Sequence, residues 1–226
     1  MSGRRFLTQH EISALLAAAL DGPNPERNHC LILMAFLHGF RASELLALNV
    51  ADLDLKGRIV YVSRLKNGFS TVHPLLPDEL KTLRRWLRVR RTILTATGQD
   101  ETRLFVSQKG RPLSRQQFYN ILAVAGKRAA LSLNPHPHML RHACGYALAD
   151  NGVDTRLIQD YLGHRNIRHT VRYTASNSAR FEGIWRPARR RRGQQLESKC
   201  HPPPLNEHIL YTFLRHRNIV QHILLI

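Results

Sequence analysis

Apolar residues recur at helical spacing through most of the first 162 residues of the chain, with one short exception. Each such segment has one apolar face, and these faces must pack on one another. The exception begins at residues 58–63, where side chains alternate, and a tight-turn pair, Asn67-Gly68, precedes residues 70–73. The sequence therefore predicts a mainly α fold with a small antiparallel β-sheet.

Capping residues and glycine or proline stops delimit the expected helices. Ser43 is expected to cap a short helix that runs to residue 48, and Ser114 a helix that runs to about residue 130. The other helices are expected over residues 8–22, 30–38, 77–94, 138–151 and 154–162, and a short strand over residues 104–106.

The composition changes after Trp185. Residues 187–226 contain an arginine run and three successive prolines, and they end in an apolar stretch. We expect one catalytic domain over residues 1–186 and a basic, proline-containing tail over residues 187–226 that is largely disordered.

The positive charge of the chain does not come from this tail alone. The formal net charge is +18, and residues 1–186 still carry 27 Lys and Arg against 14 Asp and Glu. A surplus of this size favours a polyanionic partner, because phosphate contacts release counterions. Nucleic acid is the leading candidate partner and an anionic membrane surface the weaker one.

The location of the protein is expected to be cytoplasmic. No stretch has the roughly 18 uninterrupted apolar residues of a membrane helix, and the start of the chain lacks an apolar signal-peptide core. The three cysteines are odd in number and far apart, so they indicate neither a disulfide framework nor a zinc site.

The sequence HMLRH places His138, Arg141 and His142 on one side of a helix. A zinc site formed by these histidines together with His136 is one alternative, although no nearby Cys, Asp or Glu completes the ligand set. Another alternative is that HMLRH has no site function and is simply a capped helix with solvated ends.

Other basic residues stand where helices and the hairpin end, as functional side chains often do. These are Arg41, Lys66 and His164. Each also has an ordinary structural explanation, such as an ion pair between Arg41 and Glu44. Tyr173 stands among several cations, with no carboxylate between Asp160 and Glu182.

Taken together, four segments of the chain resemble the tyrosine recombinase family, and most closely its short fimbrial phase-variation recombinases. The segments are GFRASELLAL, RLKNGFSTVHPL, PHPHMLRHACGYALADNG and DTRLIQDYLGHRNIRHTVRYTAS. The resemblance covers residues 4–186 and implies the catalytic-domain fold of that family. Most of the wider family has an amino-terminal DNA-clamping domain before the catalytic domain. The resemblance does not include that domain, which the short fimbrial recombinases also lack.

The resemblance implies a catalytic set of Arg41, Lys66, His138, Arg141, His164 and the nucleophile Tyr173. Two guanidiniums suit a phosphodiester in attack, since each presents a fork of donors to phosphate oxygens. Neighbouring cations are expected to favour the Tyr173 phenolate. Lys66 is expected to protonate the leaving 5′-oxygen, His138 to assist proton transfer at the phenol, and His164 to hold a non-bridging oxygen.

Neither a metal ion nor another cofactor is expected, because arginines neutralise the charge and the covalent link conserves the energy of the phosphodiester. Additional DNA contacts are expected from Arg64, Arg115, Arg165, Arg168 and Arg172. The resemblance implies a tetramer on double-stranded DNA with inverted-repeat sites, inversion of a segment controlling fimbrial expression, accessory DNA-bending proteins and association with the nucleoid.

Two other functions remain open from the sequence. A type IB topoisomerase would use the same chemistry to relax supercoils without a specific site. A non-enzymatic DNA-binding regulator would use residues 154–164 and the following basic turn to read DNA.

Overall fold

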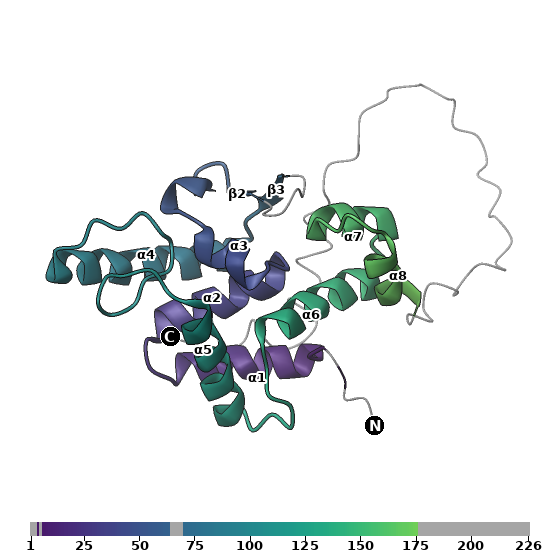
Figure 1. Cartoon of the computed structure of the whole chain (residues 1–226), viewed down its shortest axis with the longest axis horizontal. Helices are drawn as coiled ribbons and strands as arrows, with labels where there is room; N and C mark the ends of the chain where they lie inside the picture. The colour runs from purple at the N-terminus through teal and green to yellow at the C-terminus, as the bar shows by residue number, and fades with distance from the viewer. Residues whose placement is uncertain (1–3, 5, 64–69, 176–226) are drawn as a thin grey trace, which may run out of the picture.

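The helix α2 (Pro25–Leu37) lies at the centre of the fold (Figure 1). The computed structural model describes residues 4, 6–63 and 70–175. Among these residues, α2 packs against α1 (Gln9–Leu20), α4 (Pro77–Thr97) and α6 (Pro137–Asp150). A helix covered on several sides needs apolar residues around most of its circumference. The nearly continuous buried run of α2 from Cys30 to Phe36 meets this need.

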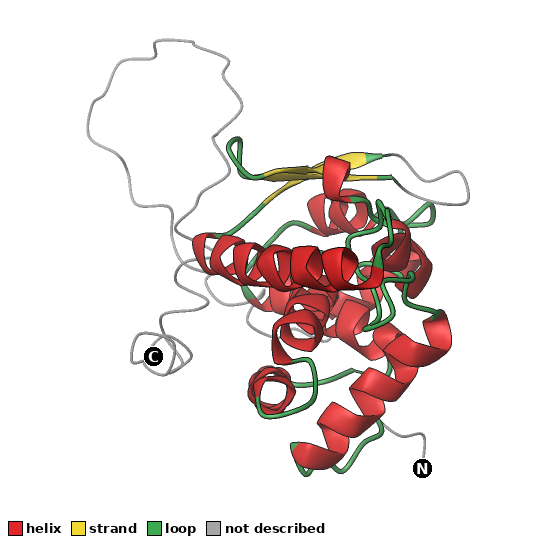
Figure 2. Ribbon diagram, turned by 90° about the vertical axis from the view of Figure 1, so that its left-hand side faces the viewer, coloured by secondary structure: helices red, strands yellow, loops and turns green. Residues whose placement is uncertain are grey.

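Three antiparallel strands form the sheet at one edge of the helical body (Figure 2). They are β1 (Leu53–Asp54), β2 (Ile59–Val62) and β3 (Thr71–Pro74), in the order β1-β2-β3. Val60 pairs with His73 and both are buried, while the next pair, Tyr61 and Val72, is exposed. The predicted mainly α fold with a small antiparallel sheet is confirmed.

Several predicted helix ends are confirmed. Thr8 and Glu11 form a capping box at the start of α1, and Ser114 caps α5 (Arg115–Arg128). Asp154 caps α7 (Thr155–Leu162), which ends at Gly163 with a positive φ of 64°. These ends follow from local side-chain hydrogen bonds, which explains why the sequence alone indicates them.

Two local predictions are wrong. Arg41, not Ser43, is the N-cap of α3 (Ala42–Ala47), because the Glu44 carboxylate accepts the Arg41 backbone N–H at 2.9 Å. Residues 104–106 do not form a named strand, and they contribute only a single bridge between Val106 and Pro112. The segment is held by side chains as well, since Trp86 Nε1 donates to the Leu104 carbonyl.

The long helix α4 separates a buried apolar side from a basic side. Leu83 and Trp86 are fully buried, whereas Arg84, Arg88 and Arg91 are exposed. This matches the predicted amphipathic pattern. None of the helices in the described ranges combines the length and hydropathy that crossing a bilayer requires.

A short last helix, α8 (Arg168–Ala175), packs against α6 and α7 and was not expected from the sequence. Figure 1 shows α6, α7 and α8 together at one end of the molecule. The hairpin tip with Arg64 and Lys66, and the proposed domain boundary at residue 186 with the tail, lie outside the described residues.

Candidate active site

Arg41 lies where the chain leaves α2 and enters α3. Gly39 makes this turn with a φ of 57°, and a Cβ there would meet Leu162 Cδ2 at 2.3 Å, so glycine is required. Arg41 Nη1 lies 2.5 Å from Oε1 of the buried Glu44, while the Arg41 side chain is 36% exposed. The ion pair that the sequence offered as an alternative is therefore present. It does not use up the guanidinium, which has five N–H donors.

Arg141 ties together two segments that lead to other candidate residues. It lies on α6 and is only 2% exposed. Its Nη1 donates to the carbonyl of Gly39, and its Nη2 donates to the carbonyl of Leu162 at 2.6 Å. Arg141 thus fixes the chain just before Arg41 and just before His164.

His164 follows the Gly163 stop of α7 and faces the same cluster. Its Nδ1 lies 2.9 Å from Thr170 Oγ1, and its carbonyl accepts from Gln159 Nε2 at 2.8 Å. Burial, reinforced by Arg141 and Arg41, lowers the pKa of His164 to about 3. His164 is therefore neutral at neutral pH and can donate one N–H to an oxygen.

Tyr173 lies on α8 and is 1% exposed. Its hydroxyl lies 2.9 Å from Nδ1 of His142 on α6. The Tyr173 ring meets Tyr146 edge to face, with centroids 5.1 Å apart, and rests on Gly145. The candidate nucleophile therefore sits inside the protein, next to the predicted cations.

Neighbouring cations favour the Tyr173 phenolate, as expected, but in this conformation burial outweighs them. Burial raises the pKa of Tyr173 to about 12, although Arg141 and Arg172 oppose the shift. The loss of solvation on burial outweighs both cations. Activation of the phenol thus requires the side chain to leave this position or a partner to take its proton.

His142 was not part of the catalytic set expected from the sequence. Burial, with His138 and Arg172 adding to it, lowers the pKa of His142 to about 4, so the ring is neutral and can accept a proton. His138, which was expected to serve the phenol, is exposed, and its ring centroid lies 5.4 Å from that of His142. The spacing of HMLRH indicated both histidines, but only the packing of α8 shows which one contacts Tyr173.

The predicted DNA-contact residues in the described ranges are exposed. Arg165, Arg168 and Arg172 lie on α8 and the turn before it, and Arg172 is close enough to lower the pKa values of Tyr173 and His142. Arg115 is the first residue of α5. Arg64 and Lys66 lie outside the described residues.

The zinc alternative finds no support in the described part of the chain. No group of three His, Cys, Asp or Glu side chains there is placed to hold a metal ion. His136 stacks on Tyr119 instead, with ring centroids 6.4 Å apart.

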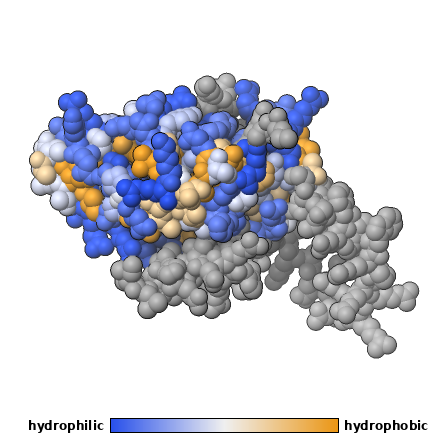
Figure 3. Space-filling model, turned by 90° about the horizontal axis from the view of Figure 1, so that it is seen from below, coloured by the Kyte–Doolittle hydropathy of each residue, from blue (hydrophilic) through white to orange (hydrophobic). Residues whose placement is uncertain are grey.

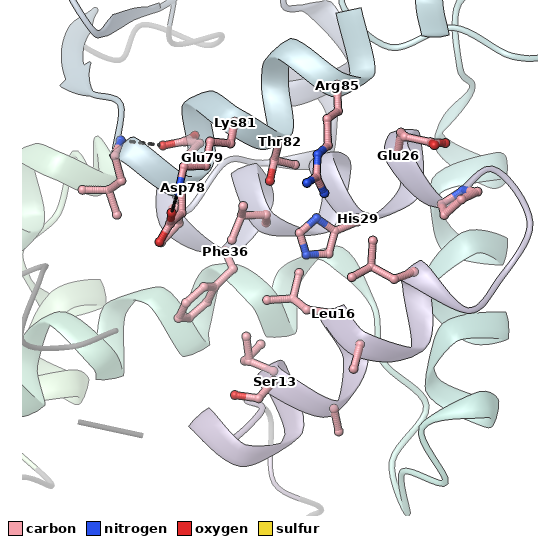
Figure 4. A pocket seen from close by; sticks show the side chains of 18 of the residues that line it. Ser13, Leu16, Glu26, His29, Phe36, Asp78, Glu79, Lys81, Thr82 and Arg85 are labelled. Carbon is pink, nitrogen blue, oxygen red and sulfur yellow. Dashed lines mark hydrogen bonds and ion pairs between the residues drawn. The ribbon is translucent and has the colours of Figure 1, made fainter. Parts of the chain in front are cut away.

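A large groove lies elsewhere in the described structure, between α1, α2 and α4. It has a volume of about 1030 Å³ and contains none of the predicted catalytic residues. Figure 4 shows Leu16 and Phe36 pointing into it, with His29 beside Arg85. Figure 3 shows hydrophobic side chains among hydrophilic ones on the underside of the view in Figure 1.

Comparison with known proteins identifies close relatives. The phage integrase family matches residues 5–180. Type 1 fimbriae regulatory protein FimB of Escherichia coli is 58% identical over 188 residues, which cover 83% of this chain and 92% of FimB. Type 1 fimbriae regulatory protein FimE of Escherichia coli is 56% identical over 185 residues, which cover 82% of this chain and 92% of FimE.

Solved structures show the same fold. XerA recombinase superposes with a TM-score of 0.68 at 26% identity, over 80% of this chain and 65% of XerA. The XerH site-specific recombinase bound to its palindromic difH substrate superposes with a TM-score of 0.67 at 24% identity, over 78% of this chain and 51% of XerH. The XerH likeness concerns the fold alone.

Proposed function

Since this chain belongs to the phage integrase family, we propose that it is a tyrosine recombinase that inverts a DNA segment controlling fimbrial expression. The high identity to FimB and FimE, along 92% of each, supports the link to fimbrial regulation. The observation that carries the chemistry is that four residues from separate segments lie close to one another: Arg141 and Arg41 lower the pKa of His164, and the Tyr173 ring lies 6.2 Å from the His164 ring.

Tyr173 is the proposed nucleophile. Its hydroxyl oxygen attacks the phosphorus of a phosphodiester, forms a 3′-phosphotyrosyl bond and displaces the 5′-oxygen. The phenol proton passes to the neutral imidazole of His142, which already lies 2.9 Å from that oxygen. Because the Tyr173 side chain is buried, the attack also requires α8 or the ring itself to move toward DNA.

The two arginines are proposed to neutralise the charge that builds on the phosphate oxygens. Arg41 is partly exposed and oriented by Glu44, so it can meet an incoming phosphate directly. Arg141 is more deeply buried and holds the backbone around the cluster. His164 donates to a non-bridging oxygen, and Lys66 protonates the leaving 5′-oxygen.

The recombining assembly is proposed to be a tetramer on double-stranded DNA that carries an inverted-repeat pair. Accessory DNA-bending proteins would bring the two sites together, and the protein would work at the nucleoid. Support comes from the basic residues Arg165, Arg168 and Arg172, which are exposed beside the candidate active site.

The test uses the DNA that flanks the gene, which is expected to contain the inverted-repeat pair. A duplex of one repeat, nicked close to the cleavage position, lets the short fragment diffuse away and traps any covalent adduct. We expect a detergent-resistant adduct whose mass maps to Tyr173, and inversion on a plasmid with both repeats. Binding without an adduct would mean a non-enzymatic regulator. Relaxation of any supercoiled plasmid regardless of sequence would mean a type IB topoisomerase.

A further inference from the structure

One face of α6 encloses the ring of Tyr173. His142, Gly145 and Tyr146 are spaced so that they lie on the same side of this helix. The Tyr173 ring rests on Gly145, and its hydroxyl lies 2.9 Å from Nδ1 of His142. It meets the Tyr146 ring edge to face, with centroids 5.1 Å apart. Tyr146 therefore forms one side of the enclosure that shields the proposed nucleophile.

The Tyr146 side chain is only partly buried, and it contacts a second aromatic ring, that of Phe6. Phe6 comes from the segment just before α1, and the two ring centroids lie 4.0 Å apart. Figure 1 shows α1 beside α6, the helix that carries Tyr146. A partly buried side chain can change rotamer unless neighbours pack against it, so Phe6 restricts the Tyr146 ring.

Other contacts fix Phe6 at the start of α1. Arg4 lies over the Phe6 ring, with its Cζ 5.6 Å from the centroid, and also pairs with Glu11 on α1. Glu11 in turn accepts from the backbone N–H of Thr8 in the capping box. Leu7, the residue after Phe6, is 2% exposed and belongs to the core. A continuous series of contacts thus runs from the first turn of α1 to the proposed nucleophile.

We propose that Phe6 and Tyr146 are positioning residues for the nucleophile: their packed rings keep Tyr173 in its buried position and so set how often the phenol is exposed. Attack on DNA requires the Tyr173 ring to leave this position, since the residue is 1% exposed. An aromatic pair that must be broken makes the exposed state about 2- to 10-fold rarer. The inference rests on the proposed function and adds two residues from outside the catalytic set.

The experiment uses three variants of the full chain and a control. Phe6→Leu keeps an apolar side chain but removes the ring that packs on Tyr146. Tyr146→Leu removes the ring that meets Tyr173, whereas Tyr146→Phe keeps both ring contacts and removes only a hydroxyl. Leu20→Ala, at an exposed position at the other end of α1, is the matched control.

The first measurement is nitration by tetranitromethane in the absence of DNA, with each tyrosine mapped by mass. We expect Tyr173 to be nitrated about 2- to 10-fold faster in Phe6→Leu and Tyr146→Leu than in the wild type. Tyr161, which is partly buried on α7, should keep its rate. Tyr146→Phe and Leu20→Ala should match the wild type at both tyrosines.

The second measurement is adduct formation on the inverted-repeat duplex at DNA concentrations below the dissociation constant. Under this condition the rate reports the free-energy difference between the free protein and the transition state, which includes exposure of the phenol. We expect Phe6→Leu and Tyr146→Leu to form the adduct faster by the same factor as in nitration. Loss of stability alone would slow the reaction, so a gain separates positioning from a structural role.

An unchanged nitration rate of Tyr173 in Phe6→Leu would overturn the inference. An equal rise at Tyr161 would overturn it too, because the whole fold would then be loosened, as would faster nitration without faster adduct formation. If the two leucine variants disagree, Phe6→Leu decides, since it leaves the side chains that contact Tyr173 unchanged. Absence of any adduct with the wild-type protein would instead refute the proposed function, while nitration would still test the packing.

Discussion

The phenolic oxygen of Tyr173 lies 2.9 Å from Nδ1 of His142, with the tyrosine side chain 1% exposed. The pair holds the proposed nucleophile in a position that is almost fully shielded from solvent. Its pKa is about 12 there, so the phenol stays protonated until the side chain moves or its proton is taken.

Tyr173→Phe should abolish the covalent adduct and inversion while retaining DNA binding. Only the hydroxyl is removed, so the ring still packs on Tyr146 and Gly145, and the cost in stability should be about 1 kcal/mol from the lost hydrogen bond. Adduct yield on the nicked duplex and a binding titration measure the two effects. Detergent-resistant adduct from the Phe variant would rule out Tyr173 as the nucleophile.

His142→Asn separates holding the phenol from accepting its proton. Asparagine can still hydrogen-bond the hydroxyl near the position of Nδ1 but cannot act as a base. Loss of a general base typically slows a reaction by about 10²–10⁴-fold, and we expect cleavage to slow by this order. The comparison is single-turnover cleavage by His138→Asn, which tests the residue expected from the sequence. A larger defect in His138→Asn than in His142→Asn would reverse the two assignments.

Arg41→Lys and Arg141→Lys should each slow cleavage by about 10²-fold or more, because lysine lacks the paired donors of a guanidinium. The two should differ in stability. Arg141 donates to two carbonyls in the interior, so its replacement should also lower the melting temperature, whereas Arg41 is partly exposed. Arg84→Lys on the exposed side of α4 is the control. Near-normal cleavage by both active-site variants would show that bidentate contact is dispensable.

Gly145→Ala should push Tyr173 out of its buried position. A Cβ at residue 145 would lie 2.6 Å from Cε2 of Tyr173, too close for any real contact. Overpacking of this kind costs about 1–3 kcal/mol, and we expect faster nitration of Tyr173 by tetranitromethane, mapped by mass. Gly126→Ala is the matched control, since its Cβ would meet Pro135 at 2.5 Å and should destabilise without exposing Tyr173. Equal nitration in the two variants would contradict the prediction.

Stability should fall as the pH is lowered from about 6.5 toward 4. Burial lowers the native pKa values of His29 and His142 to about 4 and that of His164 to about 3, whereas unfolded histidine titrates near 6.5. Within this window the unfolded chain binds more protons than the native one, so acid favours unfolding. Above about pH 7 all three are neutral in both states and contribute nothing.

Urea midpoints at several pH values measure this dependence. His29→Gln should flatten it without touching the active site, since His29 lines the groove beside Arg85. His10→Gln, at an exposed position of α1, serves as the control. A His29→Gln protein with the same pH dependence as the wild type would show that His29 does not contribute.

The parts of the fold that could be predicted are those fixed by local contacts. The Thr8 and Ser114 caps and the β2-β3 hairpin depend on neighbours in the sequence, and they appear as expected. The helix α8 was not expected, because its residues are mostly polar and it is held by packing against α6 and α7. The cap at Arg41 was missed because Glu44 supplies the hydrogen bond in place of a Ser43 hydroxyl.

The same distinction applies to the candidate site. Motif spacing brought together Arg41, Arg141, His164 and Tyr173, and the structure places them in one cluster. The motif spacing could not show that His142 rather than His138 contacts the phenol, since that depends on how α8 packs against α6. Nor could it show that burial outweighs the cations at Tyr173, because solvation depends on the whole surrounding core.

Burial of the proposed nucleophile also bears on the integrity of the chromosome. A protein with a formal net charge of +18 meets random duplex far more often than its own site. In such encounters Arg41 can reach a phosphate while the Tyr173 oxygen stays behind the protein surface. On the proposed mechanism, chance collisions would leave both strands whole, and a break would form only where binding energy suffices to draw the phenol out.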